Sequence, residues 1–262
     1  MIDTNPVVSV EDFIGKVRDD SRGCPHVWFR GEPGNVTTPL LPRLYRRRPD
    51  GSNHNENRLL QTFRMKAPTF AAVGACPDRE ATDQWLFLAQ HVGLPTRLLD
   101  WTEGALIGLY FAVRANDSVQ VEPAAVVWML NPIGLNRACA TPNLSPGDQF
   151  PLTWHDPEKG PKNIGFENIA GAWEGDTRGT KLPVAVQPTN IHPRMSVQRS
   201  CFTVHGIDKA SLADQVPQLL RRYDIEPKHR EAIQADLRLL GISHLTLWPE
   251  LDGLARELRE LY

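Results

Sequence analysis

Hydrophobic residues recur at helical spacing in several segments of the chain. In residues 10–18, apolar side chains at 10, 13, 14 and 17 share one helical face, and Ser9 with Asp12 forms a capping-box start. The pattern therefore predicts a short amphipathic helix. Similar spacing predicts further helices over residues 55–72, 81–91, 103–113, 211–222, 227–240 and 252–261.

Short apolar runs bounded by turn residues predict the strands. They cover residues 26–29, 124–130, 184–186, 195–204 and 244–247, with 97–100 as a short strand or turn. With no internal repeat and no obvious linker, we expect one α+β domain over residues 1–262, in which helices flank a mixed sheet.

Two long segments differ in composition or in predicted structure from the rest of the chain. Residues 131–183 are rich in Gly, Pro, Asn and Asp with weak periodicity, which is typical of a functional loop, a lid or an insertion. Residues 208–262 are rich in predicted helix. We expect this C-terminal part to pack on the same core.

Composition is that of an ordinary folded protein, since 41% of the 262 residues are hydrophobic and 23% are charged. The formal net charge of −2 argues against bulk electrostatic binding of nucleic acid. The basic clusters 43–48 and 221–222 leave local contact with a polyanion open, although such a run is more often a solvated face.

Targeting and redox signals favour a cytoplasmic protein without a metal site. The N-terminal stretch MIDTNPVVSVEDF has no secretory character, and the longest apolar run, 104–113, is about half of what spans a bilayer. Eight scattered histidines lack metal-ligand spacing. The cysteines, which we expect to be reduced because no C-x-x-C pair occurs, are Cys24, Cys76, Cys139 and Cys201.

The stretch HVWFRGEPG, residues 26–34, places a charge at the end of an apolar strand. Arg30 offers a fixed fork of donors that fits a phosphate or a ribose edge, and Gly31 leaves room for a ligand to approach. Alternatively, Arg30 pairs with Glu32 or another carboxylate and only ties the strand end to a loop. The tetrapeptide FRGE does not decide between the two.

A second polar group lies in HVGLPTRLLDWT, residues 91–102. Its polar residues stand among leucines, which places them at the rim of a core, where buried polar groups need partners. A pair between Arg97 and Asp100, with Thr102 capping the following helix, is one economical solution. It leaves His91 and Trp101 unexplained.

Together these stretches resemble the FRG-domain family. The resemblance rests on WFRGE, on Glu56 before an apolar helix, and on QHVGLPTRLLDWTEGALIGLYFAV, AAVVWML, RMSVQRSCFTVHG and GISHLTLWPELDGLARELR, in that order from Trp28 to Leu258. The long central motif is the most specific. Val92 replaces a frequent aromatic of the family, and Trp248-Pro-Glu replaces a frequent Phe-Pro-Asp, without loss of a candidate functional group.

The order of elements is also similar to that of ADP-ribosyltransferases. By this resemblance Arg30-Gly31 fills the early-strand position, and Asp100-Trp101-Thr102 precedes the A-x-x-F-A-like helix. Gln198 stands where many such transferases carry a glutamate. A glutamine can orient a ribose but cannot act as a base, so a required carboxylate would come from Asp100, Glu250 or Asp252.

The resemblance implies NAD as substrate, with no metal. Arg30 would grip the phosphate or ribose, an aromatic ring would stack on nicotinamide, and Gln198 or Asp100 would bond the ribose hydroxyls. The expected catalytic residues are Arg30, Asp100 and Gln198. The expected NAD-binding residues are Arg30, Gly31, His91, Arg97, Trp101, Thr102 and Tyr110.

The resulting expectation is a cytoplasmic, NAD-dependent ADP-ribosyltransferase that modifies a macromolecule, with DNA or RNA among the candidates, in a toxin or phage-defence setting. Two alternatives stay open. One is a non-catalytic module that senses a nucleotide or nucleic acid in the same pocket. The other is a metal-independent nuclease, for which the candidate residues are His91, His205 and His244.

Overall fold

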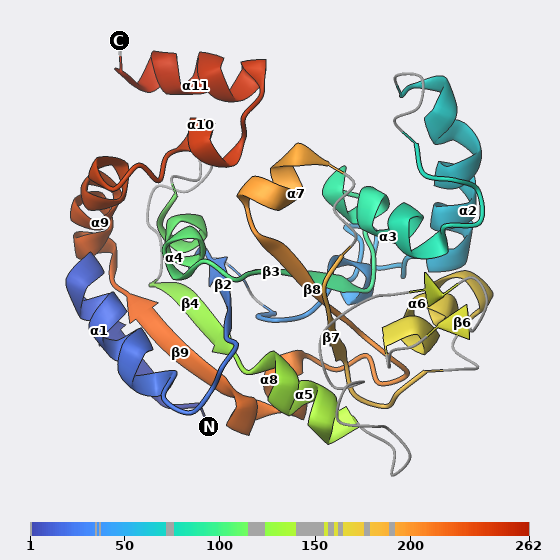
Figure 1. Cartoon of the computed structure of the whole chain (residues 1–262), viewed down its shortest axis with the longest axis horizontal. Coiled ribbons are helices and arrows are strands. Elements are labelled where there is room, and N and C mark those ends of the chain that lie inside the picture. The colour runs from blue at the N-terminus through green and yellow to red at the C-terminus, as the bar shows by residue number, and fades with distance from the viewer. Residues whose placement is uncertain are drawn as a thin grey trace.

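One mixed sheet organises the part of the chain that the structure describes (Figure 1). The computed structural model describes residues 2–34, 36, 38–71, 76–114, 124–139, 155–156, 160–161, 165–175, 179–188 and 192–261. Seven of the described strands form this sheet, in the order β1-β9-β4-β2-β3-β8-β7. β1 runs parallel to β9, and the other neighbours are antiparallel. The expected α+β class, with helices flanking a mixed sheet, is confirmed.

The strands of the sheet are β1 Thr4–Val7, β2 Trp28–Glu32, β3 Leu98–Thr102, β4 Ala125–Leu130, β7 Val184–Val186, β8 Ser200–Val204 and β9 Leu220–Ile225. A separate two-stranded ribbon joins β5, His155–Asp156, to β6, Gly160–Pro161.

The sheet is almost divided between β2 and β3. These two strands pair only at Phe29 and Thr102, whereas β2 pairs with β4 from Trp28 to Glu32 and β3 pairs with β8 along its whole length. The strands therefore part immediately after their single contact.

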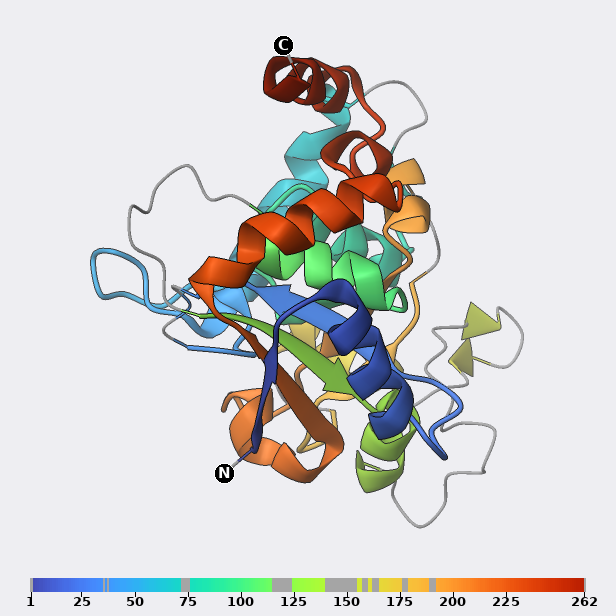
Figure 2. The ribbon, with the colours of Figure 1, turned by 90° about the vertical axis from the view of Figure 1, so that its left-hand side faces the viewer.

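The half made of β1, β9, β4 and β2 is covered by α1 (Val10–Asp20), α4 (Ala105–Val113) and α9 (Pro227–Leu239) (Figure 2). α1 buries Val10, Phe13 and Val17, as the helical spacing predicts. Phe13 meets Tyr223 edge-on, with ring centroids 5.4 Å apart. This contact joins the helical layer to the sheet.

The half made of β3, β8 and β7 packs against α2 (Glu56–Lys66), α3 (Thr82–His91) and α6 (Gly165–Glu174). Phe87 of α3 stacks on Phe202 of β8, with ring centroids 5.2 Å apart. Each half of the sheet therefore has its own apolar core on this face.

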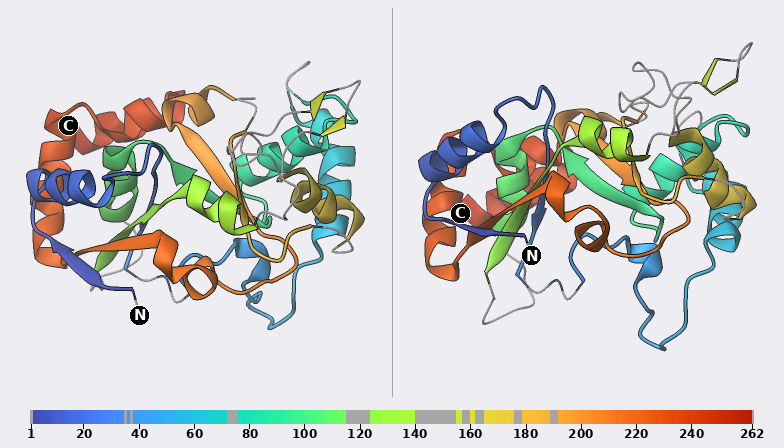
Figure 3. Two further views of the ribbon diagram at one scale, coloured as in Figure 1. Left: turned by 60° about the horizontal axis from the view of Figure 1, so that its bottom comes forward. Right: turned by 90° about the horizontal axis from the view of Figure 1, so that it is seen from below.

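On the opposite face, a third core spans both halves around Trp28, Trp101 and Trp128. Leu135 of α5 (Pro132–Cys139) and Leu212 of α8 (Leu212–Gln215) close it, and Figure 3 shows these two short helices on the lower side of the molecule. Further on, α10 (His244–Leu247) packs on α7 (Pro193–Val197) and α11 (Leu251–Leu261). In the described ranges, no helix has the length and apolar character needed to cross a membrane.

Several predicted elements are wrong. The helix expected over 211–222 ends after α8, and the chain continues as β9 because Tyr223 and Ile225 alternate into the core. The strand expected over 195–204 is the end of α7, then a turn in which Arg199 has φ 47°, and then β8. Residues 244–247 form a helix, because Ser243 and Thr246 make a capping box.

Other predictions need smaller corrections. Residues 131–183 hold the helices α5 and α6, while 140–154, 157–159, 162–164 and 176–178 lie outside the described residues. Thr102 is not the N-cap of α4, since Gly104 has that position and donates its N–H to the Thr102 hydroxyl at 3.0 Å. The edge strand β1 was not predicted, because its four residues carry too weak a pattern.

Candidate functional site

A cavity of about 380 Å³ opens where β2 and β3 part. Its walls come from both strands, from the ends of α3, α4 and α7, and from the turn that follows β2. We call it the arginine cavity, after the five arginines in its lining: Arg30, Arg43, Arg46, Arg114 and Arg194. Among the residues that the structure describes, two carboxylates line it, Glu32 and Asp100, although the whole chain is slightly acidic.

Arg30 spans the gap between the strands. Its Nε donates to Glu32 Oε1 at 3.0 Å, and its Nη1 donates to the backbone carbonyl of Asp100 at 2.8 Å. Glu32 is buried and also accepts hydrogen bonds from the Trp128 indole at 3.0 Å and the Leu40 N–H at 3.3 Å. The side chain of Arg30 remains 18% exposed. Arg30 therefore ties the strand ends together and also borders the cavity.

Gly31 has a packing role that the sequence did not reveal. A Cβ at this position would lie 2.1 Å from the Gly108 carbonyl oxygen and 2.3 Å from the Ala112 nitrogen. Such distances are far below van der Waals contact, so α4 can approach β2 only because Gly31 lacks a side chain. The helix backbone fills the space on the Cβ side of Gly31, while Gly31 itself is part of the cavity lining.

The turn after β2 brings two more arginines to Arg30. Arg46 donates to the Leu41 carbonyl through Nε at 3.0 Å and Nη2 at 2.8 Å. Burial lowers its pKa, and the charges of Arg30 and Arg43 lower it further against an opposing effect of Glu32. The charges of Arg30 and Arg43 thus act on Arg46, and three positive charges so arranged favour an anion at this wall.

Trp248 contacts the other two arginines of the lining. The guanidinium carbons of Arg114 and Arg194 lie 5.6 and 5.5 Å from its ring centroid, within the range of cation–π contact. His244 stacks on the indole with ring centroids 4.4 Å apart. Trp248 therefore orients two of the five arginines.

Asp100 is the accessible carboxylate of the cavity. Its side chain is 60% exposed, and its Oδ2 lies 3.7 Å from Nη1 of Arg30. Gln90 donates to the same Oδ2 at 2.8 Å. The carboxylate is thus fixed at the gap while it keeps contact with solvent.

Gln198 lines the cavity from the turn after α7, not from a strand. Its Nε2 donates to the Leu247 carbonyl at 2.9 Å, which attaches α10 to the site. Its backbone carbonyl accepts from the Thr102 hydroxyl at 2.7 Å. Thr102 therefore borders the cavity, and its hydroxyl is already hydrogen-bonded to the Gln198 backbone.

His91 also borders the cavity, with its ring centroid 4.2 Å from that of His192. Burial lowers the pKa of His91 to about 4, and the charge of Arg194 and the neighbouring His192 act in the same direction. His91 is consequently uncharged at neutral pH.

Of the expected NAD-binding residues, Arg97 and Tyr110 are outside the lining of this cavity, and Trp101 is in the lining but almost fully buried. Arg97 is 3% exposed and pairs with Glu56 at 2.5 Å, so the expected pair with Asp100 is wrong. Trp101 is 3% exposed, belongs to the third core and donates to the Thr203 hydroxyl at 3.0 Å. Tyr110 packs beside Trp248, with ring centroids 6.2 Å apart, and is outside the lining.

The nuclease candidates are not brought together. His91 borders the arginine cavity, whereas His205 is fully buried and burial lowers its pKa to about 3. His244 stacks against Trp248. The structure therefore offers no common centre for the three histidines.

Sequence reasoning missed Arg114, Arg194 and Trp248, and treated Arg43 and Arg46 only as part of a basic run. Arg43 and Arg46 could have been found, since they follow the FRGE motif within one turn-rich segment. Arg194 and Trp248 are distant in sequence, and no local pattern joins them to Arg30.

Comparison with protein-family models matches residues 25–120 to the FRG domain. The matched range supplies Arg30, Arg43, Arg46, Asp100 and Arg114, while Arg194, Gln198 and Trp248 lie beyond it. Searches of curated proteins and of solved structures find no match.

Proposed function

Because this chain carries an FRG domain at residues 25–120, as its sequence motifs indicate, we propose that the arginine cavity binds NAD and that the protein transfers ADP-ribose to a macromolecular acceptor. The observation that carries the proposal is the gathering of five arginines around the gap between β2 and β3. A diphosphate complements such a surface, because guanidinium groups bind phosphate oxygens through paired, charge-assisted hydrogen bonds.

The arginine wall of the cavity and the wall around Trp248 bind different parts of NAD in this proposal. Arg30, Arg43 and Arg46 hold the diphosphate, because their mutual repulsion is relieved by two negative charges. The wall around Trp248 faces the remaining, less charged end of the dinucleotide. Gln198 can accept a hydrogen bond from a ribose hydroxyl through Oε1 while its Nε2 holds α10.

Asp100 is the group that we assign to the chemical step. An acceptor nucleophile forms a bond to the anomeric carbon, the bond from that carbon to nicotinamide breaks, and nicotinamide leaves as the neutral base. The proton of the acceptor passes to the Asp100 carboxylate, whose negative charge also stabilises the oxocarbenium-like transition state. Gln90 and Arg30 keep this carboxylate at the gap.

Binding is tested by calorimetric titration of the protein with NAD. Arg43→Ala removes an exposed arginine of the cavity, and Arg47→Ala removes its exposed neighbour outside the lining. We expect about tenfold or greater loss of affinity in the first and little change in the second, since a charge-assisted hydrogen bond contributes about 1.5–3 kcal/mol. Equal losses in both variants would contradict a specific site.

Turnover is tested by release of nicotinamide and by label transfer from NAD to DNA, RNA or protein. Asp100→Asn should keep binding and lose most of the transfer, because the amide cannot accept the proton. Binding of NAD without release of nicotinamide by the unaltered protein would instead favour a sensor module.

A further inference from the structure

Gln90, Thr96 and Asp100 form a hydrogen-bonded series within one short stretch of the chain. Gln90 lies in the last turn of α3, Thr96 lies between α3 and β3, and Asp100 is the middle residue of β3. The Thr96 hydroxyl donates to Gln90 Oε1 at 2.5 Å, and Gln90 Nε2 donates to Asp100 Oδ2 at 2.8 Å. The series therefore connects a fully buried threonine to the accessible carboxylate of the arginine cavity.

A left-handed glycine turn brings Thr96 back to Gln90. Gly93 has φ 86°, and its N–H donates to the Gln90 carbonyl at 3.0 Å. The next N–H, that of Leu94, donates to the Ala89 carbonyl at 2.9 Å. These two bonds are the Schellman pattern of a helix C-terminus, in which a glycine reverses the chain. The local sequence of α3 and its turn thus determines that the two side chains meet.

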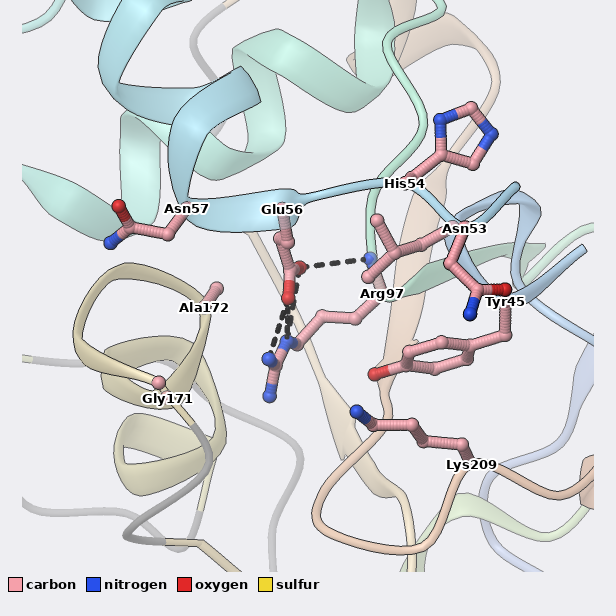
Figure 4. Close-up of a pocket in the computed structure, with 11 residues that line it drawn as sticks. Tyr45, Asn53, His54, Glu56, Asn57, Arg97, Gly171, Ala172 and Lys209 are labelled. Atoms are coloured by element: carbon pink, nitrogen blue, oxygen red, sulfur yellow. Dashed lines mark hydrogen bonds and ion pairs between the residues drawn. The ribbon is translucent and has the colours of Figure 1, made fainter. Parts of the chain in front are cut away.

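The backbone at Thr96 is fixed independently of its side chain. Its carbonyl accepts from the N–H of Leu44, which lies in the turn after β2, at 3.4 Å. The next residue, Arg97, donates to Glu56 through its backbone N–H at 3.3 Å and through its guanidinium group, and Figure 4 shows this pair. Because none of these contacts uses the Thr96 hydroxyl, they remain when the hydroxyl is removed.

The Thr96 hydroxyl holds the Gln90 amide in one orientation. The hydroxyl oxygen accepts from the Leu98 N–H at 3.2 Å, and its single hydrogen is directed to Gln90 Oε1. The amide therefore turns its NH2 group toward Asp100. In the reversed orientation, the amide oxygen and the carboxylate would face each other as two acceptors.

The Asp100 carboxylate is left with one fixed oxygen and one available oxygen. Oδ2 accepts from Gln90 and lies 3.7 Å from Nη1 of Arg30. Among the residues that the structure describes, none donates a hydrogen bond to Oδ1, and the side chain is 60% exposed. Oδ1 is therefore the oxygen that can accept a proton from a bound molecule.

We propose that Thr96 is a positioning residue of the transfer step, which acts through Gln90 to fix Oδ2 and so presents Oδ1 of Asp100 to the acceptor. The inference rests on the proposed function. As the acceptor nucleophile bonds to the anomeric carbon, its proton passes to Oδ1. The bond from that carbon to nicotinamide breaks, and the bonding pair leaves on neutral nicotinamide. A carboxylate that is held in one rotation keeps Oδ1 at the distance that proton transfer needs.

The test compares kcat and KM for NAD, measured by nicotinamide release in the presence of mixed DNA, RNA and protein. Thr96→Val removes the hydroxyl and should lower kcat about tenfold, because the Gln90 amide loses its donor. KM for NAD should change less than about twofold, since the arginines that hold the diphosphate keep their contacts. Thr96→Ser keeps a hydroxyl and should restore most of kcat.

Thr203→Val is the matched control. Thr203 is also fully buried, and its hydroxyl accepts from Trp101 at 3.0 Å, but it is outside the cavity lining and outside the Thr96 series. We expect kcat to be little changed in this variant. An equal loss of kcat in Thr96→Val and Thr203→Val would overturn the proposal, because loss of any buried threonine hydroxyl would then have the same effect.

A double variant shows whether Thr96 acts through Gln90. Gln90→Leu should lower kcat at least as much as Thr96→Val, and Thr96→Val/Gln90→Leu should lower it no further than Gln90→Leu alone. Additive losses in the double variant would overturn the proposal, as would an unchanged kcat in Thr96→Val.

A measurement without NAD distinguishes failure of this proposal from failure of the proposed function. The NMR order parameter of the Gln90 side-chain amide should be high in the unaltered protein, fall below about 0.6 in Thr96→Val and recover in Thr96→Ser. If it does so while the unaltered protein releases no nicotinamide, Thr96 orients the carboxylate and the transferase proposal fails. Equal order parameters in the three proteins would overturn the positioning role whatever the turnover.

Discussion

The guanidinium of Arg30 donates to the backbone carbonyl of Asp100 at 2.8 Å, across the point where β2 and β3 separate. This bond explains why an apolar strand ends on an arginine. The Arg30 side chain connects the two strands where their backbones no longer pair. Its charged group also borders the cavity. The two interpretations of FRGE, a tie to a carboxylate and a ligand contact, are therefore compatible with one geometry.

Arg30→Gln should lower the free energy of unfolding by about 1–3 kcal/mol, because Glu32 is buried and loses a charged partner. NAD affinity should fall in the same variant. Urea denaturation and calorimetric titration measure the two effects.

A double variant separates stability from binding. Adding Glu32→Gln removes the stranded carboxylate, so Arg30→Gln/Glu32→Gln should recover part of the stability and none of the affinity. Recovery of affinity together with stability would show that Arg30 contributes to binding only through the fold.

Gly31→Ala should strongly destabilise the protein or prevent its folding, since the new Cβ would overlap the backbone of α4 at Gly108 and Ala112. Gly15→Ala is the control within the same chain. No atom lies within 4 Å of a Cβ built at Gly15, which is a helical position of α1, so alanine should stabilise by about 0.5–1 kcal/mol there. Thermal denaturation compares both with the unaltered protein, and a tolerated Gly31→Ala would refute the packing role.

The fold was predictable where local pattern and burial agree. The spacing in α1, α3 and α9 and the apolar runs of β4 and β7 predicted the right elements, because each buries one face or both in an apolar core. The strand β9 was not predicted, since Arg221 and Arg222 interrupt its alternation of apolar residues. Its pairing with β4, which is distant in sequence, cannot be seen in the local sequence. The helix α10 was predicted as a strand for a simpler reason, because the capping residues Ser243 and Thr246 were overlooked.

The site was predictable only in part. Arg30, His91 and Asp100 were found because a charge beside an apolar run is locally visible, and the structure brings all three to one cavity. The partner of Arg97 could not be found locally, since Glu56 lies 41 residues away and competes with the nearer Asp100. The burial of Trp101 could not be predicted locally, because it follows from the alternation along β3 that places this residue in the third core.

Trp248→Leu should weaken NAD binding several-fold, because Arg114 and Arg194 lose the ring that orients them. Trp248→Phe should restore much of the affinity, since a smaller ring keeps a weaker cation–π contact. Calorimetric titration at two salt concentrations is the measurement. If leucine and phenylalanine variants bind NAD equally well, the ring does not position the arginines.

Stability should decrease as the pH falls from about 7 to 5, and two histidines contribute to this. Burial lowers the pKa of His205 to about 3 and that of His91 to about 4, so both stay uncharged in the fold while the unfolded chain takes up protons near the usual pKa of about 6.5. Because the unfolded state binds more protons in this range, acid favours unfolding.

Urea denaturation at pH 7, 6 and 5 measures how steeply the free energy of unfolding changes with pH. His91→Asn should make this slope shallower, whereas His229→Asn on α9, outside the arginine cavity, is the matched control. A slope in His91→Asn as steep as in the unaltered protein would contradict the lowered pKa of His91.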